Sequence, residues 1–204
     1  MKRSIHSRNL PACLTLLVGI TLPPLAEAQW VPFTARYKET LYRNLPDGSE
    51  ELVAEFRGSL SRASSGSEMR TKVKVSEGSP TGEGQARLKE AATGKVHHID
   101  HDERSVHVIR QLPLPLQPHP HFVPPESAAI GRRVINGVEC VGKKVLVNGQ
   151  LAPGAHWVSG NLQLIVKEDV TFPNGSRRVV EHYGFQYEEP DPSDFTIPGN
   201  YTRE

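Results

Sequence analysis

Turn signals divide this chain into short segments in which apolar and polar residues alternate. Pro46-Asp47-Gly48-Ser49, Asn136-Gly137 and Pro173-Asn174-Gly175 are such signals, because glycine and asparagine adopt the left-handed backbone that a tight reversal requires. In the segment 33–42, apolar side chains occupy nearly every second position. A period of two is typical of a strand with one buried face. A succession of such segments with local reversals predicts an antiparallel sheet.

We expect roughly nine to eleven short strands from this pattern. The main ones are 33–42, 52–60, 69–75, 85–92, 96–99, 105–109, 133–135, 138–147, a strand opening at Trp157, 162–166 and 179–187. Two segments rich in Gly, Ser or Pro, 76–84 and 148–154, are predicted to be loops. In the last strand, Tyr183 and Phe185 are expected to share one face.

Six prolines set the segment 111–125 apart from the rest of the chain. Proline lacks a backbone N–H and restricts the residue before it, so this density excludes a helix or a central strand. The leucines of the segment, together with Phe122, predict a connector that lies along the sheet. It would join the two halves of a single antiparallel domain, 29–204, and one helical turn is expected after it, at 126–130.

Residues 1–28 have the three parts of a secretory signal peptide. Lys2 and Arg3 are basic, an apolar run spans 10–25, and Ala26-Glu27-Ala28 offers small residues for cleavage after Ala28. The run is short for a bilayer span and contains prolines. We therefore expect an extracytoplasmic protein, periplasmic or secreted, with no transmembrane segment after cleavage. Its formal net charge of +1 argues against nucleic acid as a partner, because nucleic-acid binding calls for a basic stripe.

Cys140 is the only cysteine after residue 28, so an intramolecular disulfide is impossible. It shares one side of an alternating segment with Val138, and a free cysteine usually packs as a small buried hydrophobe. A reactive thiol is the alternative. The sequence has no Gly-x-Ser-x-Gly nucleophile motif and no phosphate-binding glycine loop before a helix. We predict no catalytic residue and no cofactor.

A histidine-rich turn is the strongest candidate for a metal site. Imidazole and carboxylate groups suit zinc, copper or nickel, and His97, His98, Asp100 and His101 lie within five positions. Alternation on a strand would place His98 and Asp100 on the same face. The alternative is a solvent-facing hairpin turn with no ligand.

Three motifs occur in a fixed order in the second half of the chain. They are Ile135-x-Gly137-x-x-Cys140-x-Gly142, then Trp157-x-Ser159, and then Glu189-Pro190-Asp191-Pro192-Ser193 followed by Phe195, Ile197, Pro198 and Tyr201. This order resembles a set of uncharacterised exported bacterial proteins, over residues 131–201. More distantly, it is similar to the periplasmic lipoprotein carriers. That resemblance implies a single curved antiparallel sheet or half-barrel, with few short helices, whose concave face holds acyl chains. The carriers open with a helix that covers the cavity, whereas the mature chain, after residue 28, is expected to open with a strand.

These observations lead to three hypotheses about function. The first is an exported, non-enzymatic binding protein that holds an apolar ligand, a lipid or a lipidated partner on a concave sheet face, because a curved sheet with an apolar face must cover it. The second is a structural or interaction module of the cell envelope whose sheet is filled internally. The third is a metal-dependent envelope enzyme that uses the turn at His97–His101.

Overall fold

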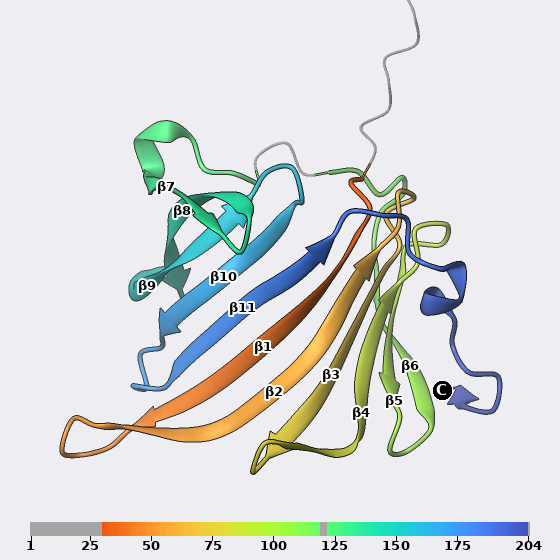
Figure 1. Cartoon of the computed structure of the whole chain (residues 1–204), viewed down its shortest axis with the longest axis horizontal. Coiled ribbons are helices and arrows are strands. Elements are labelled where there is room, and N and C mark those ends of the chain that lie inside the picture. Colours follow the sequence, from red (N-terminus) through yellow and green to blue (C-terminus); the bar gives the residue numbers. More distant parts are fainter. Residues whose placement is uncertain (1–29, 119–121, 204) are drawn as a thin grey trace, which may run out of the picture.

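The computed structural model describes residues 30–118 and 122–203, which form one twelve-stranded sheet (Figure 1). The expected signal peptide lies outside the described residues. The strands are β1 (Phe33–Asn44), β2 (Glu50–Arg62), β3 (Glu68–Ser76), β4 (Ser79–Lys89), β5 (Lys95–Asp100), β6 (Ser105–Gln111), β7 (Ala129–Ile135), β8 (Val138–Val147), β9 (Gln150–Ser159), β10 (Leu164–Thr171), β11 (Arg177–Gln186) and β12 (Thr202–Arg203). Two single-turn 3-10 helices complete the chain, η1 (Glu126–Ala128) and η2 (Pro192–Phe195).

The strands follow one another in space almost as they do in sequence. Their order is β12-β6-β5-β4-β3-β2-β1-β11-β10-β9-β8-β7. The chain therefore forms β1–β6 as one meander and β7–β11 as a second, and β11 then pairs antiparallel with β1. Among the strands of the described residues, only the short pair of β12 with β6 is parallel. The prediction of a mainly antiparallel sheet with few short helices is confirmed.

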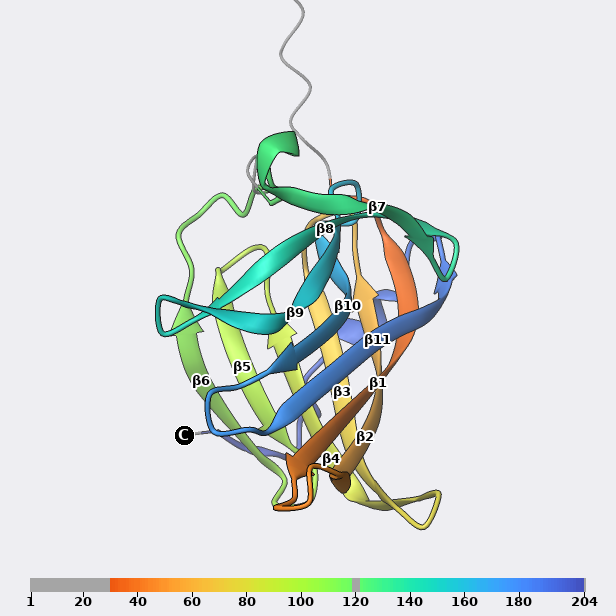
Figure 2. The same ribbon diagram turned by 90° about the vertical axis from the view of Figure 1, so that its left-hand side faces the viewer.

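The sheet curves strongly and stays open. Figure 2 shows its two ends, β6 and β7–β9, curling toward each other, while the pairing order ends at β7 without returning to β6. Neither 3-10 helix among the described residues has the length and apolar character needed to cross a membrane. The molecule is thus the expected half-barrel, with an inner and an outer face.

Two-residue turns account for several hairpins. Asn136 and Gly137 have φ angles of 51° and 82°, and Ile135 pairs directly with Val138, as expected for a tight turn with two left-handed residues. The predicted loops 76–84 and 148–154 are wrong. Glu77-Gly78 and Asn148-Gly149 have the same left-handed φ angles, so the chain reverses in two residues and the rest of each segment is strand.

Two groups of buried side chains form the core. The first lies around Phe33, Leu60, Cys140 and Val166, with Trp157 and Phe185 packed against it. The second is built from Met69, Ala86, Leu88, Ile99 and Val106 of β3–β6. Three residues of the C-terminal segment, Phe195, Ile197 and Tyr201, cover this second group. The first group therefore draws on both meanders, whereas the second belongs to β3–β6 alone.

The inward face of β11 differs from the prediction. Val180 and His182 are buried, whereas Tyr183 is 37% exposed. The pairing of β1 with β11 shifts register between Thr34 and Arg36, where Gly184 has a φ of 65°. This bulge changes which alternate residues point inward, so Phe185 packs against the core and Tyr183 does not.

Candidate functional site

The inner face of the sheet contains the largest of the cavities described here, with a volume of about 670 Å³. Its lining comes from β2, β3, β4 and β6 on one side and from β10 and β11 on the other. Strands from both ends of the sheet can line one cavity only because the sheet curls around it (Figure 2). A second cavity of about 230 Å³ continues along this face, and the two share Arg70 and Arg178.

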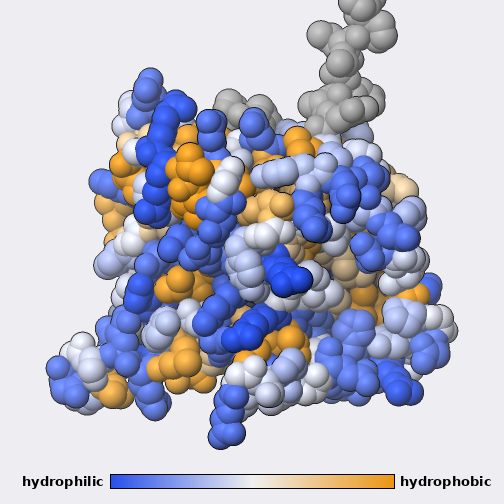
Figure 3. All heavy atoms as spheres, viewed as in Figure 1, coloured by the Kyte–Doolittle hydropathy of each residue, from blue (hydrophilic) through white to orange (hydrophobic). Residues whose placement is uncertain are grey.

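Alternation along the strands puts charged residues on this inner face. On β3, Met69 is buried in the apolar layer of the opposite face, so Glu68 and Arg70 point inward, because successive strand residues point to opposite faces. Pairing then places Arg70 opposite Leu60 and Arg87. In Figure 3, hydrophobic residues of the visible face form separate groups divided by hydrophilic ones.

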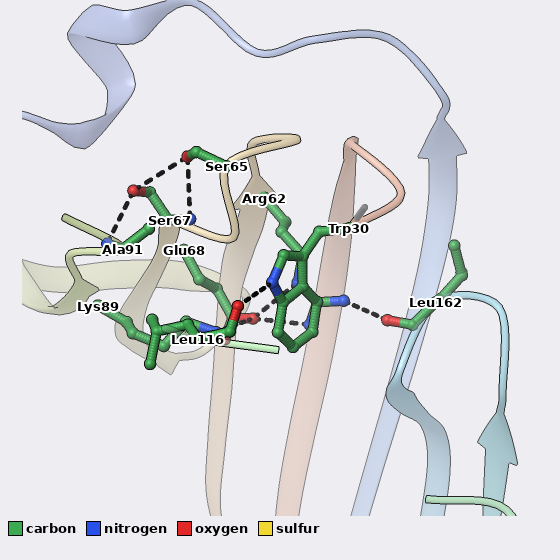
Figure 4. A network of polar contacts seen from close by, with 9 residues as sticks. All are labelled: Trp30, Arg62, Ser65, Ser67, Glu68, Lys89, Ala91, Leu116 and Leu162. Atoms are coloured by element: carbon green, nitrogen blue, oxygen red, sulfur yellow. Dashed lines mark hydrogen bonds and ion pairs between the residues drawn. The ribbon is translucent and has the colours of Figure 1, made fainter. Parts of the chain in front are cut away.

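Arg62 is the most buried cation of the cavity, with 4% of its side chain exposed. Its guanidinium forms two hydrogen bonds to Glu68, of 3.0 and 2.7 Å, and another to the carbonyl oxygen of Leu162. It also stacks over the rings of Trp30 and Phe33, at 5.1 and 5.0 Å from their centroids. Figure 4 shows this network joining β2 and β3 to the turn before β10. Such cation–π contacts are stronger where water is excluded.

The charges of this network change the acidity of Glu68. Burial raises the pKa of the Glu68 carboxyl, but the positive charges of Arg62 and Lys89 outweigh burial and hold the pKa below its usual value. Burial in turn lowers the pKa of the Lys89 ammonium, against the opposing effect of Glu68. Lys89 lies 4.8 Å from the Trp30 ring centroid. Trp30 is therefore held between two cations at one end of the cavity.

A buried histidine faces the same cavity without a partner. His182 lines the cavity and is 2% exposed, and neither ring nitrogen makes a hydrogen bond of good geometry, although the backbone of Ile165 and Val166 lies close enough to raise the pKa of the ring slightly. Its ring lies 5.4 Å from that of Tyr37. Burial, reinforced by the positive charge of Arg70, lowers the pKa of His182 to about 4. Buried polar groups are nearly always hydrogen-bonded, so this ring is an exception among the described residues.

The proline-rich connector covers the end of the cavity near Trp30. The indole N–H of Trp30 donates a hydrogen bond of 3.2 Å to the carbonyl oxygen of Leu116 (Figure 4). The backbone N–H of Leu112 donates to the carbonyl oxygen of Gly94 at 2.8 Å. Leu112, Gln117 and Phe122 line the cavity. The connector thus places apolar side chains opposite the charged sheet.

Cys140 lies on another cavity, of about 450 Å³, formed mainly by β7, β8 and β9. The residue is 3% exposed and has no disulfide partner. Burial raises the pKa of its thiol to about 11, although Arg133 opposes this effect. Because the thiolate is the reactive form, the prediction of a buried, unreactive cysteine is supported by the structure.

The histidine-rich turn spreads its side chains apart. His97 is buried near Glu90, with 3.3 Å between its Nε2 and the carboxylate, and His98 lines the smaller inner cavity. Asp100 accepts hydrogen bonds from the Glu103 N–H and the Gln85 side chain, and His101 hydrogen-bonds the Tyr201 hydroxyl at 2.8 Å. Within residues 30–118 and 122–203, no group of three His, Cys, Asp or Glu could hold a metal ion. The metal hypothesis stays a prediction.

No protein-family model and no curated protein matches this chain. Among solved structures it is similar to PNGF-II, with 12% identity and a TM-score of 0.45, over 87% of this chain and 32% of that one. This chain thus spans about a third of that protein. It is also similar to an outer membrane lipoprotein-sorting protein domain from Vibrio parahaemolyticus, with 9% identity and a TM-score of 0.37, over 83% of this chain and 91% of that one.

A LolA superfamily protein from Nitrosomonas europaea has 8% identity and a TM-score of 0.37, over 84% of this chain and 91% of that one. Two of these similar structures are thus named for lipoprotein sorting or for the LolA superfamily. Identities and TM-scores this low leave the question of function to the residues of the chain itself.

Sequence reasoning missed the inner basic face. Arg62, Arg70 and Arg178 each look like solvent-facing residues of an alternating strand. Only the pairing of β2 with β3 and of β1 with β11 brings them to one cavity. A usable signal was the alternation Arg70, Lys72, Lys74 against Met69, Val73, Val75, read together with the curvature implied by the resemblance.

Proposed function

We propose that this protein is an exported, non-enzymatic binding protein that holds an apolar ligand or the lipid part of a partner on the inner face of its sheet. The observation that carries the proposal is the open cavity of about 670 Å³ between the two curled ends. Ligand sites in proteins are typically concave and of this size. Its export, to the periplasm or the medium, is supported by the signal-like residues 1–28.

Several features support an apolar moiety in the cavity. Trp30, Phe122, Leu164, Ile165 and Val180 all line it. Trp30 is fixed there by its hydrogen bond to Leu116 of the connector. Removing apolar ligand surface from water is worth about 25 cal/mol per Å², so even a partly apolar lining favours an acyl chain.

A neutral fluorescent probe, N-phenyl-1-naphthylamine, tests this proposal. We expect saturable binding to the wild-type protein, and at least about ten-fold weaker binding to Ile165→Trp, which fills the cavity. The matched control is Leu151→Trp, since Leu151 is 64% exposed and outside the cavity lining. Non-saturable binding, or equal binding by all three proteins, would favour the rival hypothesis of a filled envelope module.

A further inference from the structure

We infer that the inner face recognises an anionic head group, and that the ligand is an anionic amphiphile whose head lies between Arg70 and Arg178. This inference rests on the proposed function and adds the chemical class of the ligand. Its basis is the charge of the cavity wall, the unpaired state of Arg70 and the buried, unpartnered ring of His182.

The inner face concentrates positive charge that the whole chain does not have. Seven cationic side chains line the two connected cavities, against three glutamates: Arg62, Arg70, Lys72, Arg87, Lys89, Arg110 and Arg178 against Glu39, Glu68 and Glu168. The wall thus has an excess of four positive charges, while the full chain carries a net charge of only +1. A concave surface lined by one sign of charge raises the local concentration of the opposite ion.

Four of these seven cations are already paired, and three have no ion-pair partner among the described residues: Arg70, Arg87 and Arg110. Arg178 lies 3.0 Å from Glu39 and 3.5 Å from Glu168, and Lys72 lies 2.9 Å from Glu39. Within the described part of the chain, Arg70 has no ion-pair partner and stacks over the Tyr37 ring at 5.4 Å from its centroid. A guanidinium presents a planar fork of donors that fits a carboxylate or phosphate. Of the three unpaired cations, Arg70 alone lines both cavities, so it is the recognition group that we assign.

His182 supplies an independent observation at the same place. Both ring nitrogens are buried and unpartnered, and the ring lines the cavity that Arg70 also lines. A neutral imidazole has one N–H donor and one acceptor nitrogen. An anionic head beside Arg70 would lie next to this ring and would offset the positive charge of Arg70 that acts on it. The apolar tail would then extend under the connector, toward Trp30 and Phe122.

Isothermal titration calorimetry with three probes tests this inference. Decyl phosphate, decyl maltoside and inorganic phosphate are each titrated into the full exported protein, below the micelle concentration. We expect decyl phosphate to bind at least about ten-fold more tightly than either other probe. We also expect its binding to weaken with added salt, because ion pairs with partly exposed cations are screened.

A pair of charge-matched variants locates the head. Arg70→Gln should weaken decyl phosphate binding by about ten-fold or more, whereas Arg36→Gln should change it less than about two-fold. Arg36 is exposed and lies between the buried Ala35 and Tyr37 on β1, so it points to the outer face. Arg70→Lys, which keeps the charge but loses the fork, should fall between wild type and Arg70→Gln. Should Arg70→Gln not fold, Arg70→Lys and the salt dependence still test the inference.

The outcomes separate this inference from the proposed function. Equal binding of decyl phosphate and decyl maltoside, unaffected by Arg70→Gln, would overturn the anionic head and leave an apolar ligand site intact. Inorganic phosphate binding as tightly as decyl phosphate would support the anion site but contradict an amphiphile. Absence of binding by all three probes would contradict both proposals.

Discussion

Lowering the pH should destabilise this protein through His182. The folded-state pKa of the ring is about 4, and an unfolded histidine titrates near about 6.5. The unfolded state therefore binds more protons between these values, and the stability that is fully present above about pH 6.5 is lost as the pH falls toward about 4. From pH 7.5 to pH 5, the loss from this residue alone amounts to about 2 kcal/mol.

The variant His182→Leu isolates this contribution. Leucine has a similar volume and no titrating group, so the free energy of unfolding of the variant should lack about 2 kcal/mol of the acid loss seen in the wild type. At pH 7.5 the variant should lie within about 1 kcal/mol of the wild type, because the imidazole makes no hydrogen bond there. Urea unfolding at pH 7.5, 6 and 5, followed by tryptophan fluorescence, measures both quantities.

Val180→Ala is the matched control for this experiment. Val180 is 5% exposed and lies two residues from His182 on the same strand. Its truncation should lower stability by a constant amount at all three pH values, since it removes no titrating group. If His182→Leu gave a stability curve parallel to that of the wild type, the neutral, buried state assigned to His182 would be refuted.

Three further predictions concern other parts of the molecule. Glu68→Gln should lower the free energy of unfolding by about 3 kcal/mol, because it leaves the Arg62 charge buried and unpaired. The control Glu55→Gln removes the partly exposed pair with Lys38 and should cost less than about 1 kcal/mol in urea unfolding. Similar losses for both variants would contradict the network. Cys140 should react with a thiol reagent only as fast as the protein unfolds, since burial raises the pKa of its thiol to about 11. Equal labelling rates in native and denatured protein would contradict the buried state of Cys140. Adding zinc or a chelator should leave the melting temperature of the protein unchanged, because the four side chains of the histidine-rich turn do not converge. One metal ion per chain in the purified protein would instead support the metal hypothesis.

The sequence predicted the strands better than the turns between them. Alternation and Asn-Gly turn signals were sufficient for the hairpin at Asn136-Gly137. At Glu77-Gly78 and Asn148-Gly149, the neighbouring Gly, Ser and Pro residues indicate loops by composition and mask the turn signal. Composition describes a segment on average, whereas a two-residue turn depends on two φ angles. The strand residues after these turns were therefore missed.

The candidate site was harder to predict than the fold, because it depends on register and curvature. A charged residue on an alternating strand is normally interpreted as facing solvent. Arg70 lies on β3 and His182 on β11, with β2 and β1 between these strands. The curl of the sheet brings both side chains to the same cavity. The bulge at Gly184 also changes which alternate residues of β11 point inward, and no residue pattern indicates its position.

Native mass spectrometry tests the central claim, that the inner face of this open sheet holds a ligand. The full protein would be exported from cells, purified in a mild non-ionic detergent and measured beside Ile165→Trp, whose new side chain fills the cavity. The account predicts a wild-type mass above that of the polypeptide, with fragmentation releasing an anionic amphiphile, and a much smaller bound fraction in the variant. A wild-type protein that carries only the polypeptide mass, and that still takes up no decyl phosphate when it is added, would contradict the account.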